Sequence, residues 1–288
     1  MANLKEIRNR ISSVSSTMQI TSAMKMVSAA KLKKAQDAIT AMRPYSDKLT
    51  ELLQSLSATM DDDSGSKFAE QRKVHKVMLV PITSNRGLAG GFNSNIIKET
   101  NRLIRDVYAD KEVSVLTIGK KANDAYKKSN RVIANRSDIY DDLSFENVSQ
   151  VAELLMKYFV DYHADKIVLV YNKFKNAATQ EIMAEQFLPI APLEEEDDVE
   201  VTLDYIFEPS KEEIIEQLIP KSLKTQLFKA LRDSFASEHG ARMTAMHKAT
   251  DNATELRDQL KLTYNKARQA SITNEILEIV GGAEALNN

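Results

Sequence analysis

The sequence predicts an α/β insert plus long α-helices: an antiparallel two-helix coiled coil formed by the N- and C-terminal arms, with a Rossmann-like parallel-sheet domain between them. Three observations predict this fold class. Glycine and proline are concentrated in the middle of the chain, apolar residues repeat in heptads along both ends, and the middle alternates short β-branched runs with helical stretches.

Both ends of the chain are poor in helix breakers. Before Gly65 the only glycine or proline is Pro44, and no proline follows Pro220. Five of the eight glycines lie between Gly65 and Gly119. This distribution indicates two long helices that flank a globular insert.

The N-terminal arm carries a heptad repeat in which nine of twelve seam positions are apolar. The seam positions are Leu4, Ile7, Ile11, Val14, Met18, Thr21, Lys25, Ser28, Leu32, Ala35, Ile39 and Met42. Three consecutive positions are polar, and the apolar residues beside them are Ile20, Met24 and Val27. We therefore expect a local drift of register that turns Met24 and Lys25 outward.

The C-terminal arm repeats with the same spacing of four and three. Its predicted seam is Ala249, Ala253, Leu256, Leu260, Thr263, Ala267, Ala270, Asn274 and Leu277. Many of these residues are small, so two backbones could approach closely. Arms that match in period and lie at opposite ends of the chain pair most simply as an antiparallel coiled coil.

The middle of the chain reads as a parallel α/β domain. Its expected strands are Val77–Ile82, Val113–Ile118 and Lys166–Tyr171, with Gln180–Leu188 as one further strand. Its expected helices are Asn93–Tyr108, Lys120–Ser129 and Glu146–Tyr162. The predicted division of the chain is an N-terminal coiled-coil helix at 1–59, a linker at 60–72, the α/β domain at 73–205 and a C-terminal coiled-coil helix at 206–288.

Composition excludes several kinds of chemistry. The chain has no cysteine, and its four histidines fit no metal-ligand spacing. Lys and Arg number 39 against 41 Asp and Glu, which argues against a general nucleic-acid binder. The longest charge-free run, Ile11–Met24, is too short to span a membrane. We expect no catalytic residue, no cofactor and no metal.

Three local motifs have structural explanations. The loop Ser84–Asn93 follows a strand and opens a helix but lacks the order of a phosphate-binding loop, so we expect a tight turn with Asn93 as the helix N-cap. The acidic run Glu194–Glu200 is expected to be a solvated loop. The carboxylates of Asp138, Asp141 and Asp142 are expected to form turns.

The first 36 residues contain seven basic residues and one acid. They could form a transit peptide, a basic arm for nucleic acid, or a helix that faces acidic partner surfaces. The heptad continues to Met42, which disfavours a removable peptide, and no aromatic residue lies among the basic ones, which disfavours single-strand binding. We favour the third interpretation.

Both arms resemble the gamma-subunit family of F-type ATP synthases. The matching segments are Ile7–Ala35, the loop Ser84–Asn93, Asp204–Ser210 and Ala241–Ala283, in one order along essentially the whole chain. Two departures are Ala89, where many members have Cys, and Asn85, where Asp is common.

The resemblance implies the central rotor shaft of a proton-translocating ATP synthase, with no active site of its own. The coiled coil would lie inside a hexamer of three alpha and three beta subunits. The α/β domain would form a foot on the membrane c-ring beside the epsilon subunit. The chain would be peripheral, without a membrane span or bound nucleic acid, on the cytoplasmic face of a bacterial inner membrane. A mature organelle form is the alternative location.

The resemblance also implies contact residues. It places Met24 and Lys25 against an acidic loop of the beta subunit. The remaining implied contacts are Arg242, Arg268, Gln269 and Thr273 near beta-subunit loops, Ile276, Ile279 and Val280 in an apolar tip, and Tyr205 and Glu208 facing the ring.

Two other functions compete with the shaft. A coiled-coil scaffold with a small-ligand-binding α/β head would behave as a monomer or homodimer. A nucleic-acid-binding helix would show steeply salt-dependent DNA binding. The shaft requires copurification with alpha and beta subunits.

Overall fold

The computed structural model describes residues 4–57, 67–68, 70–129, 131–190 and 211–287. The chain divides into two units. One unit takes in residues 1–28 and 243–288, and the other takes in residues 29–242. The helices α1, Leu4–Ser57, and α5, Lys211–Asn287, contribute to both units. The predicted division at 59, 72 and 205 stays a prediction, because the structure does not describe residues 58–66 and 191–210.

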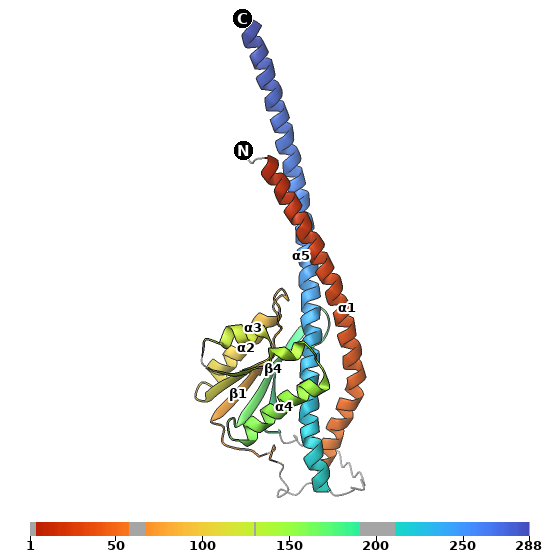
Figure 1. The fold of residues 1–288 in the computed structure, drawn as a ribbon, viewed down its shortest axis with the longest axis vertical. Helices are drawn as coiled ribbons and strands as arrows, with labels where there is room; N and C mark the ends of the chain where they lie inside the picture. The colour runs from red at the N-terminus through yellow and green to blue at the C-terminus, as the bar shows by residue number, and fades with distance from the viewer. Residues whose placement is uncertain (1–3, 58–66, 69, 130, 191–210, 288) are drawn as a thin grey trace. The chain divides into compact units, whose positions relative to one another are not determined.

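The larger unit contains a five-stranded sheet in the order β3-β2-β1-β4-β5 (Figure 1). Its strands are β1 Lys76–Pro81, β2 Glu112–Thr117, β3 Val132–Asn135, β4 Lys166–Phe174 and β5 Gln180–Leu188. The first four pair in parallel, and β5 runs antiparallel to β4. The sheet is therefore mixed, and the four predicted strands are confirmed. The sequence did not reveal β3, a four-residue edge strand with alternating burial.

Alternation along the strands places apolar side chains on both faces of the sheet. On one face, Val77 and Leu79 of β1 pack with Ile96 of α2. On the other face, Met78 and Val80 join the core formed with α4 and α5. The helices beside the sheet are α2 Phe92–Arg102 with a π-helical turn at Leu103–Val107, α3 Lys120–Tyr126 and α4 Phe145–Val160.

Part of α5 belongs to the core of this α/β unit. Leu223, Leu227 and Leu231 are 3%, 0% and 0% exposed and pack in the same cluster as the sheet. Polar contacts add to this packing, since the Ser237 hydroxyl donates to the Asn172 carbonyl at 3.0 Å. The C-terminal arm is thus an integral element of the sheet domain as well as a coiled-coil helix.

In the smaller unit, α1 and α5 pair in antiparallel directions (Figure 1). Residue numbers rise along α1 while the numbers of their contact partners on α5 fall. The contacting pairs are Arg8 with Tyr264, Met18 with Arg257, Thr21 with Thr250 and Lys25 with His247. This confirms the predicted antiparallel pairing of the two arms.

The predicted drift of register in α1 is wrong. All twelve predicted seam positions are buried or half-buried, including the polar ones. Thr21 is 8% exposed and Ser28 is 2% exposed, whereas Ile20 and Val27 are 60% and 57% exposed. The seam stays in register because its polar members find partners: Thr21 Oγ1 lies 2.8 Å from Thr250 Oγ1.

The predicted seam of α5 is correct at four of its nine positions, and Ala249 is one of the four. Ala253, Leu260 and Ala267 are buried or half-buried as expected. Leu256 and Thr263 are exposed, and the residues beside them, Arg257 and Tyr264, take the seam positions. These two long side chains contact α1 through Met18 and Arg8, so polar and aromatic contacts replace the expected apolar ones.

Candidate functional site

Between residues 20 and 27, α1 exposes several apolar side chains outside the helix pair. Ile20, Met26 and Val27 are 60%, 65% and 57% exposed. Ile20, Met24 and Val27 follow the spacing of one helix face, and Met24 is half-buried. An apolar face exposed beside a polar seam marks a surface for interaction with another molecule.

Lys25 lies on the seam instead of pointing freely outward. Its Nζ is 3.3 Å from His247 Nδ1, and that nitrogen is 3.4 Å from Asp251 Oδ2. A lysine ammonium only donates, so the contact requires Nδ1 to accept. Lys25 therefore contributes positive charge at the edge of the helix pair while its side chain is held by α5.

The C-terminal part of α5 is exposed along its whole described surface. Every side chain from 268 to 283 is exposed, which includes Arg268, Gln269 and Thr273. The predicted tip residues Ile276, Ile279 and Val280 are 55%, 68% and 51% exposed. Large apolar side chains exposed in such number mark an interaction surface. Tyr205 and Glu208 lie outside the described residues.

Arg242, the remaining predicted contact residue, is bound within its own chain. Its side chain is 9% exposed and forms an ion pair with Glu238 one turn away. Its Nη2 donates to the carbonyl oxygens of Arg86 and Gly87 at 3.3 and 3.2 Å. The guanidinium thus joins α5 to the loop that follows β1.

Asn93 is not the N-cap of α2, contrary to expectation. The helix begins at Phe92, and the N-cap position is held by Gly91 without a side-chain hydrogen bond. Asn93 Oδ1 instead accepts from the Ser84 backbone N–H at 2.9 Å. The Asn93 side chain therefore bridges the two ends of the loop.

Comparison with known proteins identifies the family. A family described as ATP synthase matches residues 3–286. The ATP synthase gamma chain of Christiangramia forsetii is 70% identical over 287 residues, covering 100% of both chains. That of Geobacter sp. is 45% identical and covers 99% of both. The chain belongs to the ATP synthase gamma chain family.

Solved structures show the same fold. A chain of the Euglena gracilis mitochondrial ATP synthase, OSCP/F1/c-ring, superposes with a TM-score of 0.69 at 22% identity, covering 98% of this chain and 94% of that one. A rotor chain from the same organism gives a TM-score of 0.66 at 22% identity, covering 93% and 98%. The mixed sheet with two long helices is therefore the fold of known ATP synthase chains.

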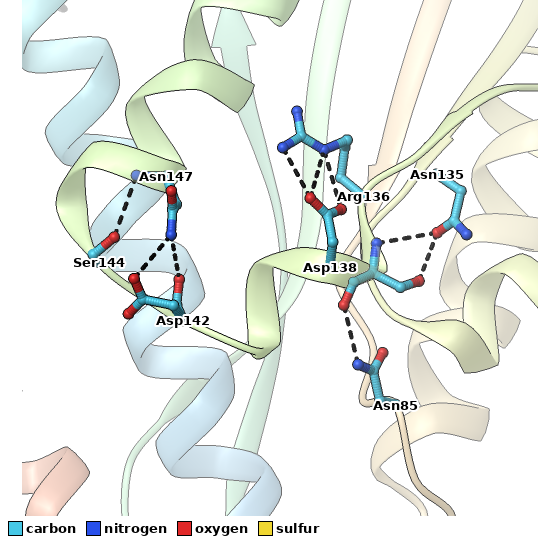
Figure 2. A network of polar contacts seen from close by, with 8 residues as sticks. Asn85, Asn135, Arg136, Asp138, Asp142, Ser144 and Asn147 are labelled. Atoms are coloured by element: carbon cyan, nitrogen blue, oxygen red, sulfur yellow. Dashed lines mark hydrogen bonds and ion pairs between the residues drawn. The ribbon is translucent and has the colours of Figure 1, made fainter.

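The polar residues at the carboxyl edge of the sheet serve this gamma chain structurally (Figure 2). Asn85 after β1 donates to the Ser137 carbonyl at 3.0 Å, and Asn135 Oδ1 accepts from the Ser137 hydroxyl at 2.6 Å. Asp138 pairs with Arg136 at 3.1 Å, and this contact lowers the pKa of Asp138. The Asp138 carboxylate is thus held in a local ion pair at the short 3-10 turn Ser137–Tyr140.

Asp142 has the same kind of role at the start of α4. Its carboxylate accepts from the Asn147 side chain at 3.1 Å, and the Ser144 hydroxyl caps the helix by accepting from the Asn147 N–H (Figure 2). Across the described residues, no three His, Asp or Glu side chains are grouped to hold a metal ion. None of the described helices is long and apolar enough to cross a membrane.

A buried polar cluster near Arg242 was not predicted from the sequence. Glu238 and His239 are 7% and 5% exposed, and the phenol of Tyr140 lies near them. Burial raises the pKa of Glu238, although Arg242 opposes this change. Burial, with help from Arg242 and Lys31, lowers the pKa of His239 to about 4. Only adjacency of Glu, His and Arg on one helix could have signalled this cluster.

Proposed function

We propose that this gamma chain is the non-catalytic central rotor shaft of a proton-translocating ATP synthase. It would couple proton flow through the membrane c-ring to ATP synthesis or hydrolysis in the alpha/beta hexamer. The observation that carries the proposal is the exposed apolar surface of α5 from 268 to 283, because such a surface needs a surrounding partner.

The helix pair of the smaller unit suits a shaft that drives three neighbours differently. One side of α1 exposes Ile20, Met26 and Val27, while most other exposed positions of this segment are charged or polar. A single pair of helices cannot present the same face to three surrounding subunits at once. Only differential contact shifts the conformational equilibrium of a partner, so rotation of an asymmetric shaft would change each partner in turn.

We assign the contacts to extended surfaces instead of single ion pairs. An exposed ion pair contributes only about 0–1 kcal/mol, so Lys25 or Arg268 alone could not transmit the coupling energy. We propose Met24 and Lys25 on α1, and Arg268, Gln269 and Thr273 on α5, as contacts to the beta subunits. Arg242 would contribute to coupling indirectly, because its side chain is bound to the carbonyls of Arg86 and Gly87 in the loop after β1.

The apolar tip would favour smooth rotation. Ile276, Ile279 and Val280 offer apolar contacts, which have no fixed direction, so no particular partner has to be broken at each step. A surrounding sleeve of alpha and beta subunits would cover these side chains in every orientation.

The remaining assignments concern partners and location. ATP chemistry would take place in the beta subunits, with three alpha and three beta subunits to each gamma chain. The epsilon subunit and the c-ring would bind the foot, with Tyr205 and Glu208 facing the ring. The chain would be peripheral, on the cytoplasmic face of a bacterial inner membrane.

Subunit stoichiometry tests the proposal. An affinity-tagged form of this chain, purified from its own organism's membranes after mild detergent extraction, should bring down alpha and beta subunits at three of each per tagged chain. Native mass spectrometry of the eluate measures this ratio. Recovery of the tagged chain only as a monomer or homodimer would contradict the shaft and favour a scaffold protein.

A further inference from the structure

The imidazole of His247 places one ring nitrogen between two charged partners. Its Nδ1 lies 3.3 Å from Nζ of Lys25 on α1 and 3.4 Å from Oδ2 of Asp251, one turn further along α5. All three side chains belong to the smaller unit. Lys25 and Asp251 are thus the charged groups that α1 and α5 place against the ring, and Lys248, the next residue on α5, is exposed.

The two contacts require opposite states of Nδ1. An ammonium group only donates hydrogen bonds, so Lys25 is bound only while Nδ1 carries a lone pair and the proton of the neutral ring is on Nε2. An ionised carboxylate only accepts, so Asp251 is bound only when Nδ1 carries a proton. The imidazolium ion has a proton on each nitrogen, which excludes the contact with Lys25 and adds repulsion between two cations.

The ring is open to protons from solvent. The side chains of His247 and Asp251 are 57% and 63% exposed, and Lys25 is half-buried on the seam. Histidine is the side chain that ordinarily changes its charge between about pH 5 and 8, whereas lysine and aspartate ordinarily keep theirs. A change of pH within this range therefore acts on the histidine and leaves the charges of its two partners in place.

We propose that His247 is a proton-operated switch between α1 and α5. The neutral ring holds the Lys25 side chain against α5. When the ring binds a proton, Nδ1 turns from Lys25 to Asp251 and releases the lysine from the seam. Acid thus replaces a contact between the two helices with a contact inside α5. The switch is a property of this chain alone, and its effect on a complex rests on the proposed function, in which Lys25 contacts a beta subunit.

Chemical modification of the full-length chain tests the release of Lys25. Acetic anhydride acetylates free amines, and mass spectrometry of the digested protein compares Lys25 with Lys248. Because Lys248 lies beside His247 on α5, the ratio cancels both the general effect of pH on amines and the added charge of the ring. The ratio should rise about threefold from about pH 8 to pH 5, since Lys25 loses one hydrogen bond. A constant ratio in the wild type would overturn the proposal.

Two variants assign the switch to its partners. His247→Gln should hold the ratio constant across the pH series, because no titrating ring remains. In Asp251→Asn the charged ring loses its acceptor, so the rise should occur about half a pH unit lower, a threefold loss of proton affinity. Asp258→Asn is the matched control, since this carboxylate pairs with Arg257 elsewhere on α5. A rise that persists in His247→Gln, or an unmoved rise in Asp251→Asn, would contradict the switch.

The consequence for coupling has its own readout in assembled complexes in membrane vesicles. Proton pumping per ATP hydrolysed should change between about pH 8 and pH 6 by about twofold more in the wild type than in His247→Gln. Equal pH dependence in the two proteins would overturn the role of the switch in coupling. Failure of the rotor proposal would look different: the wild-type chain itself would not copurify with alpha and beta subunits.

Discussion

The hydroxyl groups of Thr21 and Thr250 lie 2.8 Å apart and join the two long helices of the smaller unit through a polar layer. Each hydroxyl is also within reach of a backbone carbonyl on its own helix, that of Met18 at 3.1 Å or Met246 at 2.8 Å. A polar layer inside a helix pair favours one register, because sliding would break the contact between the two hydroxyls.

This layer predicts non-additive effects of substitution. Thr21→Val or Thr250→Val alone should lower the free energy of unfolding by about 1 kcal/mol, since the remaining threonine loses a partner. The double Val variant should lose less than the sum, because two apolar groups then meet in the seam. Urea unfolding followed by circular dichroism measures these values. Strictly additive losses would contradict a direct interaction between the two residues.

A substitution at Gly119 should strongly destabilise the α/β unit. Gly119 has φ of +98°, and a Cβ there would lie 2.0 Å from the Thr83 carbonyl oxygen. Thr83 also accepts from the Ala122 N–H through its side chain, so a shift would disturb the start of α3. Gly119→Ala should cost roughly 2–4 kcal/mol.

Gly87→Ala is the control for this prediction. A Cβ at Gly87 would come no closer than 3.8 Å to Lys121 Cε, an ordinary contact. Thermal unfolding should separate the two variants clearly. Equal midpoint temperatures of unfolding for Gly119→Ala and Gly87→Ala would show that the close approach to Thr83 does not limit the side chain at Gly119.

His239 should make the protein sensitive to acid. Its pKa is lowered from 6.5 to about 4 by burial and by the nearby Arg242 and Lys31. Between these values the unfolded chain binds a proton and the folded chain does not, so stability falls as the pH drops from 6.5 towards 4. The loss is at most about 3 kcal/mol.

His239→Gln should remove this pH dependence, whereas His163→Gln, at an exposed position, should not. The raised pKa of Glu238 acts in the opposite sense, since protonation at low pH relieves its burial cost. The quantity to compare is therefore the free energy of unfolding of His239→Gln minus that of the wild type, measured at each pH. Parallel stability curves for these two proteins would refute the assignment to His239.

Substitution of Ile279 should separate folding from function. The side chain is 68% exposed, so Ile279→Ser should change the free energy of unfolding of the isolated chain by less than about 0.5 kcal/mol. ATP synthesis by the assembled complex should fall, because apolar contact at the tip is lost. Asn274→Ser, at an exposed polar position in the same segment, should leave synthesis unchanged. Equal synthesis rates in both variants would argue against an apolar tip.

The sequence revealed the main elements because their signals are local. Scarcity of glycine and proline predicted α1 and α5, and β-branched runs predicted the central strands. Strand β3 was missed because its four residues carry no long apolar run. The seam of α1 was misread at Thr21 and Lys25 because a count of apolar residues cannot anticipate polar partners on another helix.

The candidate site was less accessible to sequence reasoning. The apolar tip at Ile276, Ile279 and Val280 was expected only from the family resemblance, and the structure shows these side chains exposed. The bonds of Arg242 could not be predicted, because its partner Gly87 lies 155 residues away in the chain. The role of Asn93 was misjudged for a related reason: its partner Ser84 lies across a loop whose conformation depends on tertiary contacts.

Rotation within the assembled complex tests the central claim most directly. A probe fixed to an exposed position of the α/β unit, with the alpha/beta hexamer immobilised, reports the orientation of this chain during ATP hydrolysis. A shaft inside three catalytic pairs should turn in one direction in three equal steps per revolution. ATP hydrolysis at the normal rate with a stationary probe would contradict the account.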